Sequence, residues 1–124
     1  MSEAARSIFE TRSFTQSDFD QFALMSGDDN PIHVDPTFSA RTRFGRTVAH
    51  GMLLFTVLRG LVARLAPGAY LTSQELTFPA PTYAGDPMCF LVRLHACEAE
   101  MEVSRVCDGL VTCIGKAAVR GTQT

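Results

Sequence analysis

The longest hydrophobic pattern in the chain runs from His50 to Leu65 and has helical spacing. Its apolar side chains, which occupy most of the circumference of a helix about 24 Å long, are Met52, Leu53, Leu54, Phe55, Val57, Leu58, Leu61, Val62 and Leu65. Pro67-Gly68 ends this helix. Because a helix that is apolar nearly all round is buried, we expect this segment at the centre of the fold.

After residue 70 the pattern changes to that of strands. Four segments rich in apolar and β-branched residues are expected as strands, at residues 70–78, 88–97, 101–107 and 110–119. In the second of them every other residue is apolar, which predicts one face that packs on the long helix. Asp108-Gly109 predicts a hairpin turn, and Gly85-Asp86-Pro87 and Glu98-Ala99-Glu100 predict the other short links. Strands joined by such short links pair antiparallel.

Before the long helix the chain combines one short helix with an extended polar segment. Residues 7–14 are expected to be extended, and Thr15 with Asp18 forms a capping box that begins a helix ending at Gly27. Residues 28–48 are expected to be irregular, since Asn30-Pro31 disfavours helix, except for one turn that begins at Asp35-Pro36. About twenty irregular residues are unusual in a compact domain, and loops of that length are usually functional.

These elements predict a single α+β domain over residues 1–124, in which a curled antiparallel sheet wraps around the long helix. The chain is 46% hydrophobic and 19% charged. So high an apolar fraction predicts that a partner also covers part of the surface, and an oligomer is therefore expected.

Charge and targeting patterns narrow the class of partner. The formal net charge is −2 with no long run of one sign, so nucleic acid and anionic membranes are not expected partners. No signal-peptide pattern is present in residues 1–12, and no apolar run is long enough to span a bilayer, which predicts a cytoplasmic protein. The four cysteines lack metal-ligand spacing and are expected to be reduced, partly buried thiols: Cys89, Cys97, Cys107 and Cys113. A small molecule is therefore the expected class of partner.

Candidate chemistry concentrates in the long polar segment. Asp28 and His33 are residue types suited to acid–base work on a water molecule, and His50-Gly51 stands at the start of the long helix. On spacing alone a plainer interpretation stays open, in which Asp28 caps the loop and His33 is a half-buried structural histidine. The same alternative applies to His50. Three arginines, Arg41, Arg43 and Arg46, form either a solvated surface or an anion site.

The run Gly27-Asp28-x-Asn30-Pro31-Ile32-His33, followed by five residues and Ser39, resembles the hydratase 2 motif of the MaoC-like dehydratases. This family of hot-dog-fold enzymes includes the (R)-specific enoyl-CoA hydratases. The resemblance extends through Ala49-His50-Gly51-Met52 and the long helix, then loosely through the strands to Val119. It implies a hot-dog fold and the addition of water to trans-2-enoyl thioesters, with no cofactor and no metal.

Carried over residue by residue, the resemblance implies that Asp28 and His33 hold the water that adds to C3, giving an (R)-3-hydroxyacyl product. Gly51 would bind the thioester oxygen through its N–H group, at a helix N-terminus where the dipole stabilises enolate charge. The substrate-binding candidates are Asn30, which more simply braces the loop, His50, Met52, Phe55, Arg59 and, for CoA phosphates, Arg41, Arg43 and Arg46. Plain core packing is the alternative for the apolar helix positions.

The resemblance also implies an acyl-CoA or acyl-carrier-protein thioester as substrate and a homodimer or dimer-based oligomer. Two positions depart from the family pattern. Asp29 adds a second carboxylate beside Asp28 and is expected to face solvent. Arg59 in mid-helix would suit a short or carboxylated acyl group. Two alternatives remain, a hot-dog acyl-thioesterase whose carboxylate directs water to the carbonyl carbon, and a non-catalytic acyl-thioester-binding subunit. The direction of reaction, hydration or dehydration, stays open.

Overall fold

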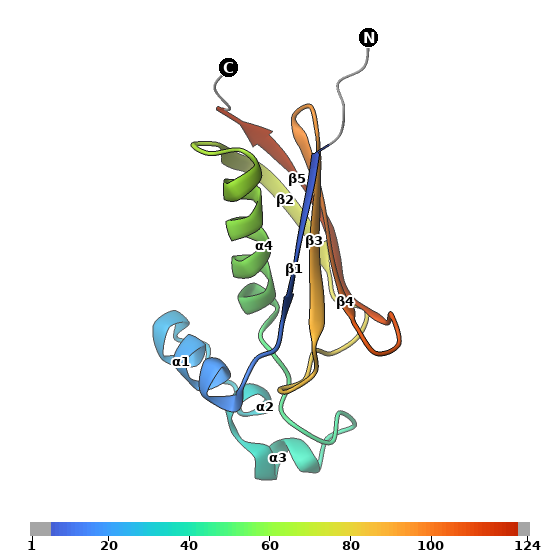
Figure 1. The fold of residues 1–124 in the computed structure, drawn as a ribbon. Coiled ribbons are helices and arrows are strands. Elements are labelled where there is room, and N and C mark those ends of the chain that lie inside the picture. The colour runs from blue at the N-terminus through green and yellow to red at the C-terminus, as the bar shows by residue number, and fades with distance from the viewer. Residues whose placement is uncertain (1–5, 122–124) are drawn as a thin grey trace.

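A five-stranded antiparallel sheet and one long helix make up most of the molecule. The computed structural model describes residues 6–121. Its elements in chain order are β1 (Arg6–Arg12), α1 (Gln16–Ser26), α2 (Pro31–Val34), α3 (Pro36–Ala40), α4 (Gly51–Leu65), β2 (Tyr70–Thr77), β3 (Met88–His95), β4 (Glu98–Arg105) and β5 (Val111–Arg120). The strand order is β1-β3-β4-β5-β2. Helix α4 lies along the sheet, and α1, α2 and α3 gather beside its N-terminal end (Figure 1).

The core lies between α4 and the inner face of the sheet. Met88, Phe90, Val92 and Leu94 alternate along β3 and are all buried, as the alternation in the sequence predicts. They meet the buried face of α4, formed by Leu54, Leu58, Leu61 and Val62. Each large apolar side chain buried in this way contributes about 1.5–3 kcal/mol. The expected α+β fold, an antiparallel sheet around a long helix, is confirmed.

The expectation that α4 is buried all round is wrong for this chain. Met52 is 50% exposed, and an exposed stripe continues through Thr56, Gly60, Ala63 and Arg64. The sheet packs on one side of the helix only, so a pattern that is apolar on nearly all sides exceeds what one chain can cover. No helix within residues 6–121 is long and apolar enough to cross a membrane.

The strands differ from the prediction at one turn and in number. Residues 7–14 contain most of a fifth strand, β1, which pairs with β3. Strand β4 begins at Glu98, because the turn from β3 consists of Ala96 and Cys97, with Ala96 at a φ of 51°. The charged residues around Ala99 suggested a link, but they occupy the solvent-facing positions of β4, where charges are well tolerated.

The ends of α1 agree with the sequence, whereas the next segment is more helical than expected. Thr15 and Asp18 form the predicted capping box, and Gly27 ends the helix with a φ of 82°. Contrary to expectation, α2 is helical from Pro31, since proline is well suited to the first position of a helix and the side chain of Asn30 accepts a hydrogen bond from the N–H of Ile32. The predicted turn after Asp35 is confirmed as α3.

Candidate active site

Three side chains of the polar segment meet at the N-terminal end of α4. Asp28 follows the end of α1, His33 lies in α2, and His50 immediately precedes α4. One ligand-type atom from each lies within 4.8 Å of the others. The Oδ2 atom of Asp28 is 3.9 Å from the Nε2 atom of His33. Residues that are far apart in the sequence thus form one compact acid–base cluster.

Backbone contacts fix the orientation of His33. Its Nδ1 atom is 2.8 Å from the carbonyl oxygen of Val48, and because a carbonyl only accepts, Nδ1 carries the hydrogen. In the neutral ring Nε2 is then a bare acceptor on the side of Asp28. The segment of Val48 is itself held, since its N–H donates to the carbonyl of Ile32, which also accepts from the buried hydroxyl of Ser39. This is the structural role of the serine that closes the motif.

Asp28 presents one carboxylate oxygen to the cluster and uses the other locally. Its Oδ1 atom accepts from the N–H of Asn30 at 3.4 Å, and its own N–H donates to the hydroxyl of Ser26. The distance of 3.9 Å from Oδ2 to His33 is too long for a direct hydrogen bond. A single water placed between these two acceptors can donate one hydrogen to each. Asp29 is exposed, as expected.

His50 is buried beside this pair. It is 2% exposed, and its Nε2 atom lies 2.9 Å from the backbone carbonyl of Asp28. Its ring stacks on His33, with centroids 3.8 Å apart and an interplanar angle of 21°, and meets the ring of Phe22 edge-on. Burial lowers the pKa of His50 below its ordinary value; the hydrogen bond to Asp28 opposes this shift and the nearby His33 adds to it. The imidazole is therefore neutral near pH 7.

The stacking of the two rings decides what the cluster can hold. A metal ion binds imidazole in the plane of the ring, at about 2.0–2.1 Å from nitrogen for zinc. The planes of His33 and His50 are close to parallel, so lone pairs in those planes do not converge on one ion. Moreover, one nitrogen of each ring already meets a backbone carbonyl. The arrangement suits acid–base chemistry on water.

A cavity of about 410 Å³ lies against the cluster. Its walls combine Asp28 with Arg43 and Phe44, the segments 48–52 and 78–82, Leu54 and Thr112. Gly51 forms the first turn of α4, and its N–H has no acceptor within residues 6–121. A β-carbon at Gly51 would lie 2.6 Å from the ring of Phe78, so any other residue here requires that ring or the start of α4 to move. The cavity therefore brings a carboxylate and a free helix N-terminal N–H to one space.

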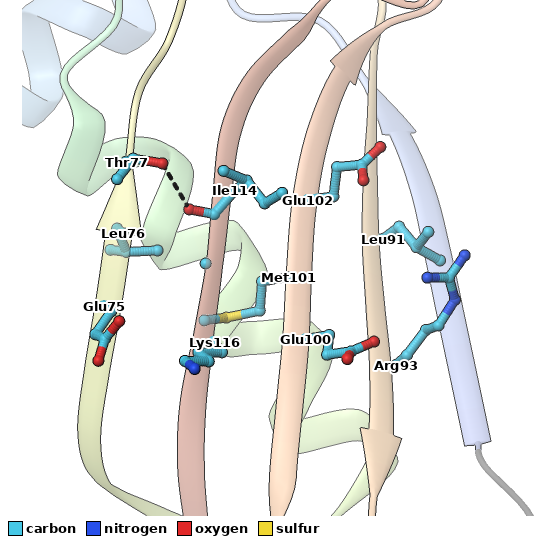
Figure 2. Close-up of a pocket in the computed structure, with 11 residues that line it drawn as sticks. Glu75, Leu76, Thr77, Leu91, Arg93, Glu100, Met101, Glu102, Ile114 and Lys116 are labelled. Atoms are coloured by element: carbon cyan, nitrogen blue, oxygen red, sulfur yellow. Dashed lines mark hydrogen bonds between the residues drawn. The ribbon is translucent and has the colours of Figure 1, made fainter.

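A second hollow, of about 450 Å³, lies on the face of the sheet turned away from α4 (Figure 2). Across it Arg93, Glu100, Lys116 and Glu75 are consecutive cross-strand neighbours with alternating charge. Such neighbours neutralise one another, as on an ordinary solvated sheet face. This hollow contains no counterpart of the Asp28 and His33 pair among the residues that line it.

Residues 3–110 match the model of the MaoC-like domain family. The chain belongs to this family. Among the relatives, an (R)-specific enoyl-CoA hydratase from Aeromonas caviae is 33% identical over 113 residues, covering 90% of this chain and 84% of that protein. A 3-hydroxybutyryl-CoA dehydratase from Methylorubrum extorquens is 42% identical over 77 residues. That match covers 60% of this chain and 49% of the relative, so the chain spans about half of that protein's length.

Solved structures of MaoC-like relatives have the same fold. The (R)-hydratase from Aeromonas caviae involved in PHA biosynthesis superimposes with a TM-score of 0.88 at 28% identity, covering 95% of this chain and 96% of that one. An R-hydratase from Pseudomonas aeruginosa superimposes with a TM-score of 0.87 at 26% identity, covering 98% and 83%. The predicted hot-dog fold and family resemblance are confirmed.

The structure separates the substrate-binding candidates of this MaoC-like chain into two groups. His50, Met52 and Arg43 line the cavity together with the proposed catalytic residues Asp28 and Gly51. His33 stands behind Asp28, outside the lining. Phe44, Phe78 and Thr82 also line the cavity and were not anticipated, because the loops that bring them there have no periodic pattern in the sequence.

The remaining candidates lie outside the cavity lining. The guanidinium of Arg59 donates to the carbonyl of Ala69 at 3.0 Å, which ties the middle of α4 to the residue that precedes β2. Arg46 lies over the ring of Tyr83 and pairs with Asp86 at 3.4 Å. Arg41 is exposed, Phe55 packs partly buried against the core, and Asn30 caps α2. Within one chain, Arg43 is thus the arginine nearest to the cavity.

Proposed function

We propose that this protein catalyses the reversible, (R)-specific hydration of trans-2-enoyl thioesters to 3-hydroxyacyl thioesters. The observation that carries the proposal is the placement of Asp28 and His33, with acceptor atoms 3.9 Å apart, beside a cavity that Gly51, whose N–H is free, also lines. Two relatives are named for opposite directions of this reaction, an enoyl-CoA hydratase and a 3-hydroxybutyryl-CoA dehydratase, and they support the same chemistry. Both directions use one site.

In the hydration direction, the carboxylate of Asp28 takes a proton from the water while the water oxygen forms its bond to C3. The Nε2 atom of His33 accepts a hydrogen bond from that water and orients it. The electrons of the double bond move toward the thioester, and the enolate oxygen accepts a hydrogen bond from the N–H of Gly51. At this position the helix dipole of α4 also stabilises the negative charge. The abstracted proton is then delivered to C2 on the same face, which gives syn addition. No cofactor enters these steps.

The substrate we propose is an acyl-CoA or acyl-carrier-protein thioester. The cavity has apolar walls from Phe44, Leu54 and Phe78, which suit an acyl chain. Arg43 lies at this cavity, is exposed, and has no ion pair within the described part of the chain. It is therefore available to an anionic group of the carrier, such as a CoA phosphate.

We also propose a homodimer formed through the free edge of β2. The two edge strands differ in charge: β1 contains Arg6, Glu10 and Arg12, and Glu10 is also 3.5 Å from Arg64 of α4. By contrast, β2 has Glu75 as its one charged residue in eight and is mostly exposed. An edge strand with few charges readily pairs with another strand. A cytoplasmic location, predicted from the sequence, is part of this proposal and is checked by cell fractionation.

The decisive assay follows the loss of conjugated thioester absorbance when crotonyl-CoA is hydrated. Asp28→Asn removes the carboxylate that takes the proton, and His33→Ala removes the acceptor that orients the water, so we expect activity to fall by about a hundredfold or more in each. His95→Gln is the matched control, because His95 is exposed on β3, away from the cavity.

Other outcomes of this assay separate the alternatives. Full activity in Asp28→Asn would contradict the mechanism. Release of CoA thiol without hydration would instead indicate a thioesterase, and binding without turnover a non-catalytic acyl-thioester-binding subunit. Chain length and carrier are resolved by repeating the assay with longer enoyl groups and with acyl-carrier-protein thioesters.

A further inference from the structure

His50 makes contacts that connect both halves of the proposed site. Its Nε2 atom meets the carbonyl of Asp28, its ring faces stack on His33, and its backbone joins directly to Gly51. It is thus bonded or packed to each of the three residues to which the hydration mechanism assigns a role. Of the three histidines in the chain, it is the one that is buried.

Resting on the proposed function, we infer that His50 is a positioning residue that sets the distance between the water site and the oxyanion site. Asp28 belongs to the end of α1 and Gly51 to the start of α4, and within the described residues the side-chain link between these two points is the bond from His50 to the Asp28 carbonyl. Stacking on His33 places the third group relative to the same ring. The side chain of His50 therefore contacts both Asp28 and His33, while its backbone leads into Gly51.

The carbonyl of Asp28 determines the direction of its hydrogen bond with His50. A carbonyl oxygen cannot donate, so Nε2 of His50 carries the hydrogen, and Nδ1 is bare in the neutral ring. Nδ1 is buried and has no hydrogen-bond partner within residues 6–121. A donor at the Nε2 position and a flat ring against His33 are therefore the two properties that the inference requires of residue 50.

A positioning role predicts a specific kinetic signature. The reacting groups would move apart without His50, and a misplacement of about 1 Å can cost about a hundredfold in rate. His50 is one of the residues that line the cavity, but the apolar walls proposed to hold the acyl chain come from Phe44, Leu54 and Phe78, so substrate affinity should change little. We therefore expect kcat to fall while KM stays nearly constant.

Three substitutions separate the donor from the ring. His50→Phe keeps a flat ring but removes the donor, and should lower kcat by about a hundredfold. His50→Gln places an amide N–H near the position of Nε2, so kcat should exceed that of His50→Asn, whose shorter amide mimics Nδ1, by about tenfold. His95→Gln, the matched control on the sheet surface, should leave kcat unchanged. Circular dichroism and thermal unfolding establish that each variant is folded.

The inference is overturned if all three His50 variants keep kcat within about twofold of the wild type, or if kcat stays constant while KM rises. Equal kcat in His50→Gln and His50→Asn would also contradict it. If the variants do not fold, nitrogen-15 NMR of the wild-type protein gives the answer: a neutral His50 protonated at Nε2 supports the inference, and protonation at Nδ1 refutes it. A wild-type protein without hydratase activity would refute the proposed function, while the NMR result would still test the His50 bond.

Discussion

At the scale of single residues, the site depends on which hydrogen-bonding atoms are already occupied. The backbone carbonyl of Val48 accepts a hydrogen bond from Nδ1 of His33, which leaves Nε2 to face Asp28. The first N–H of α4 at Gly51 stays free for the same reason that every helix begins with unpaired donors. The two proposed acceptors for water and the proposed donor for an oxyanion therefore result from ordinary backbone geometry.

Gly51→Ala should abolish activity without unfolding the protein. The new methyl group would lie 2.6 Å from the ring of Phe78, so the ring must move or the start of α4 must shift. Either change disturbs the proposed oxyanion donor, and removing one such donor typically costs about a hundredfold to a thousandfold in kcat. Crotonyl-CoA hydration measures the loss. The double variant Gly51→Ala, Phe78→Ala makes room for the methyl group and should recover part of the rate; no recovery would contradict the steric cause.

The free energy of unfolding should depend on pH through His50. Burial lowers its pKa in the folded state, so below the ordinary value of about 6.5 the unfolded chain binds more protons than the folded one. Stability should therefore fall as the pH drops from about 7 toward about 5. His50→Gln removes this contribution, whereas His95→Gln retains it. Urea unfolding across this pH range gives the measurement, and parallel curves for wild type and His50→Gln would refute the prediction.

At the scale of elements, the ends of the helices carry the site. Gly27 ends α1 with a left-handed backbone, and Asp28 follows in the direction that this turn sets. Asn30 caps α2, which contains His33, and Asp35 caps α3, which follows it. The capping residues thus convert a long polar segment into a defined surface, and proline at the first helical positions reinforces it.

Gly27→Ala and Gly60→Ala form a matched pair with opposite expected effects. Neither new methyl group meets an atom within 4 Å. Gly27 has a φ of 82°, so alanine there should destabilise the protein by about 1–2 kcal/mol and lower kcat by displacing Asp28. Gly60 lies within α4 and alanine should stabilise it by about 0.5–1 kcal/mol. Thermal unfolding distinguishes them, and equal shifts of both variants in one direction would contradict this account.

At the scale of the whole molecule, one chain leaves apolar surface uncovered at three places. Along α4 the stripe that includes Met52 is exposed, and the edge strand β2 is flanked by the exposed rings of Tyr70 and Phe78. The two most exposed large apolar side chains, Leu24 and Met25, belong to the end of α1. Apolar surface of this kind is expected where protein partners or ligands bind.

Lysine at the β2 edge should weaken the proposed homodimer. Ser73→Lys places a charge on the exposed strand, where two copies would bring like charges and hydrated side chains together. Thr11→Lys makes a comparable change on the other edge strand, β1, and should leave the dimer intact. Light scattering over a dilution series gives the mass of each protein. A wild-type protein with the mass of one chain would refute the dimer, and equal weakening by both variants would refute its placement at β2.

The exposed cysteines should also report on the fold. Cys97 and Cys107 are exposed, Cys89 is partly buried, and burial raises the pKa of the Cys113 thiol to about 11. Alkylation of the native protein near neutral pH should modify Cys97 and Cys107 and leave Cys113 unmodified, because the thiolate is the reactive form. Peptide mass spectrometry identifies the labelled residues. Modification of Cys113 before unfolding would contradict its burial.

By itself, the amino-acid sequence determined the long helix, the alternation of β3, the capping box of α1 and the family of the chain. These features depend on neighbouring residues a few positions apart, and local spacing is what periodic patterns and motifs record. The same is true of the pairing of Asp28 with His33, which lie on one continuous segment.

Tertiary structure alone decided three matters that the sequence left open or misjudged: that α4 is exposed along one stripe, that Arg59 binds the carbonyl of Ala69, and that His50 stacks on His33 and binds the Asp28 carbonyl. Each depends on contacts between residues that are distant from one another in the sequence. Spacing shows which residue types are available, whereas packing decides which of their atoms meet. The proposed chemistry rests on both.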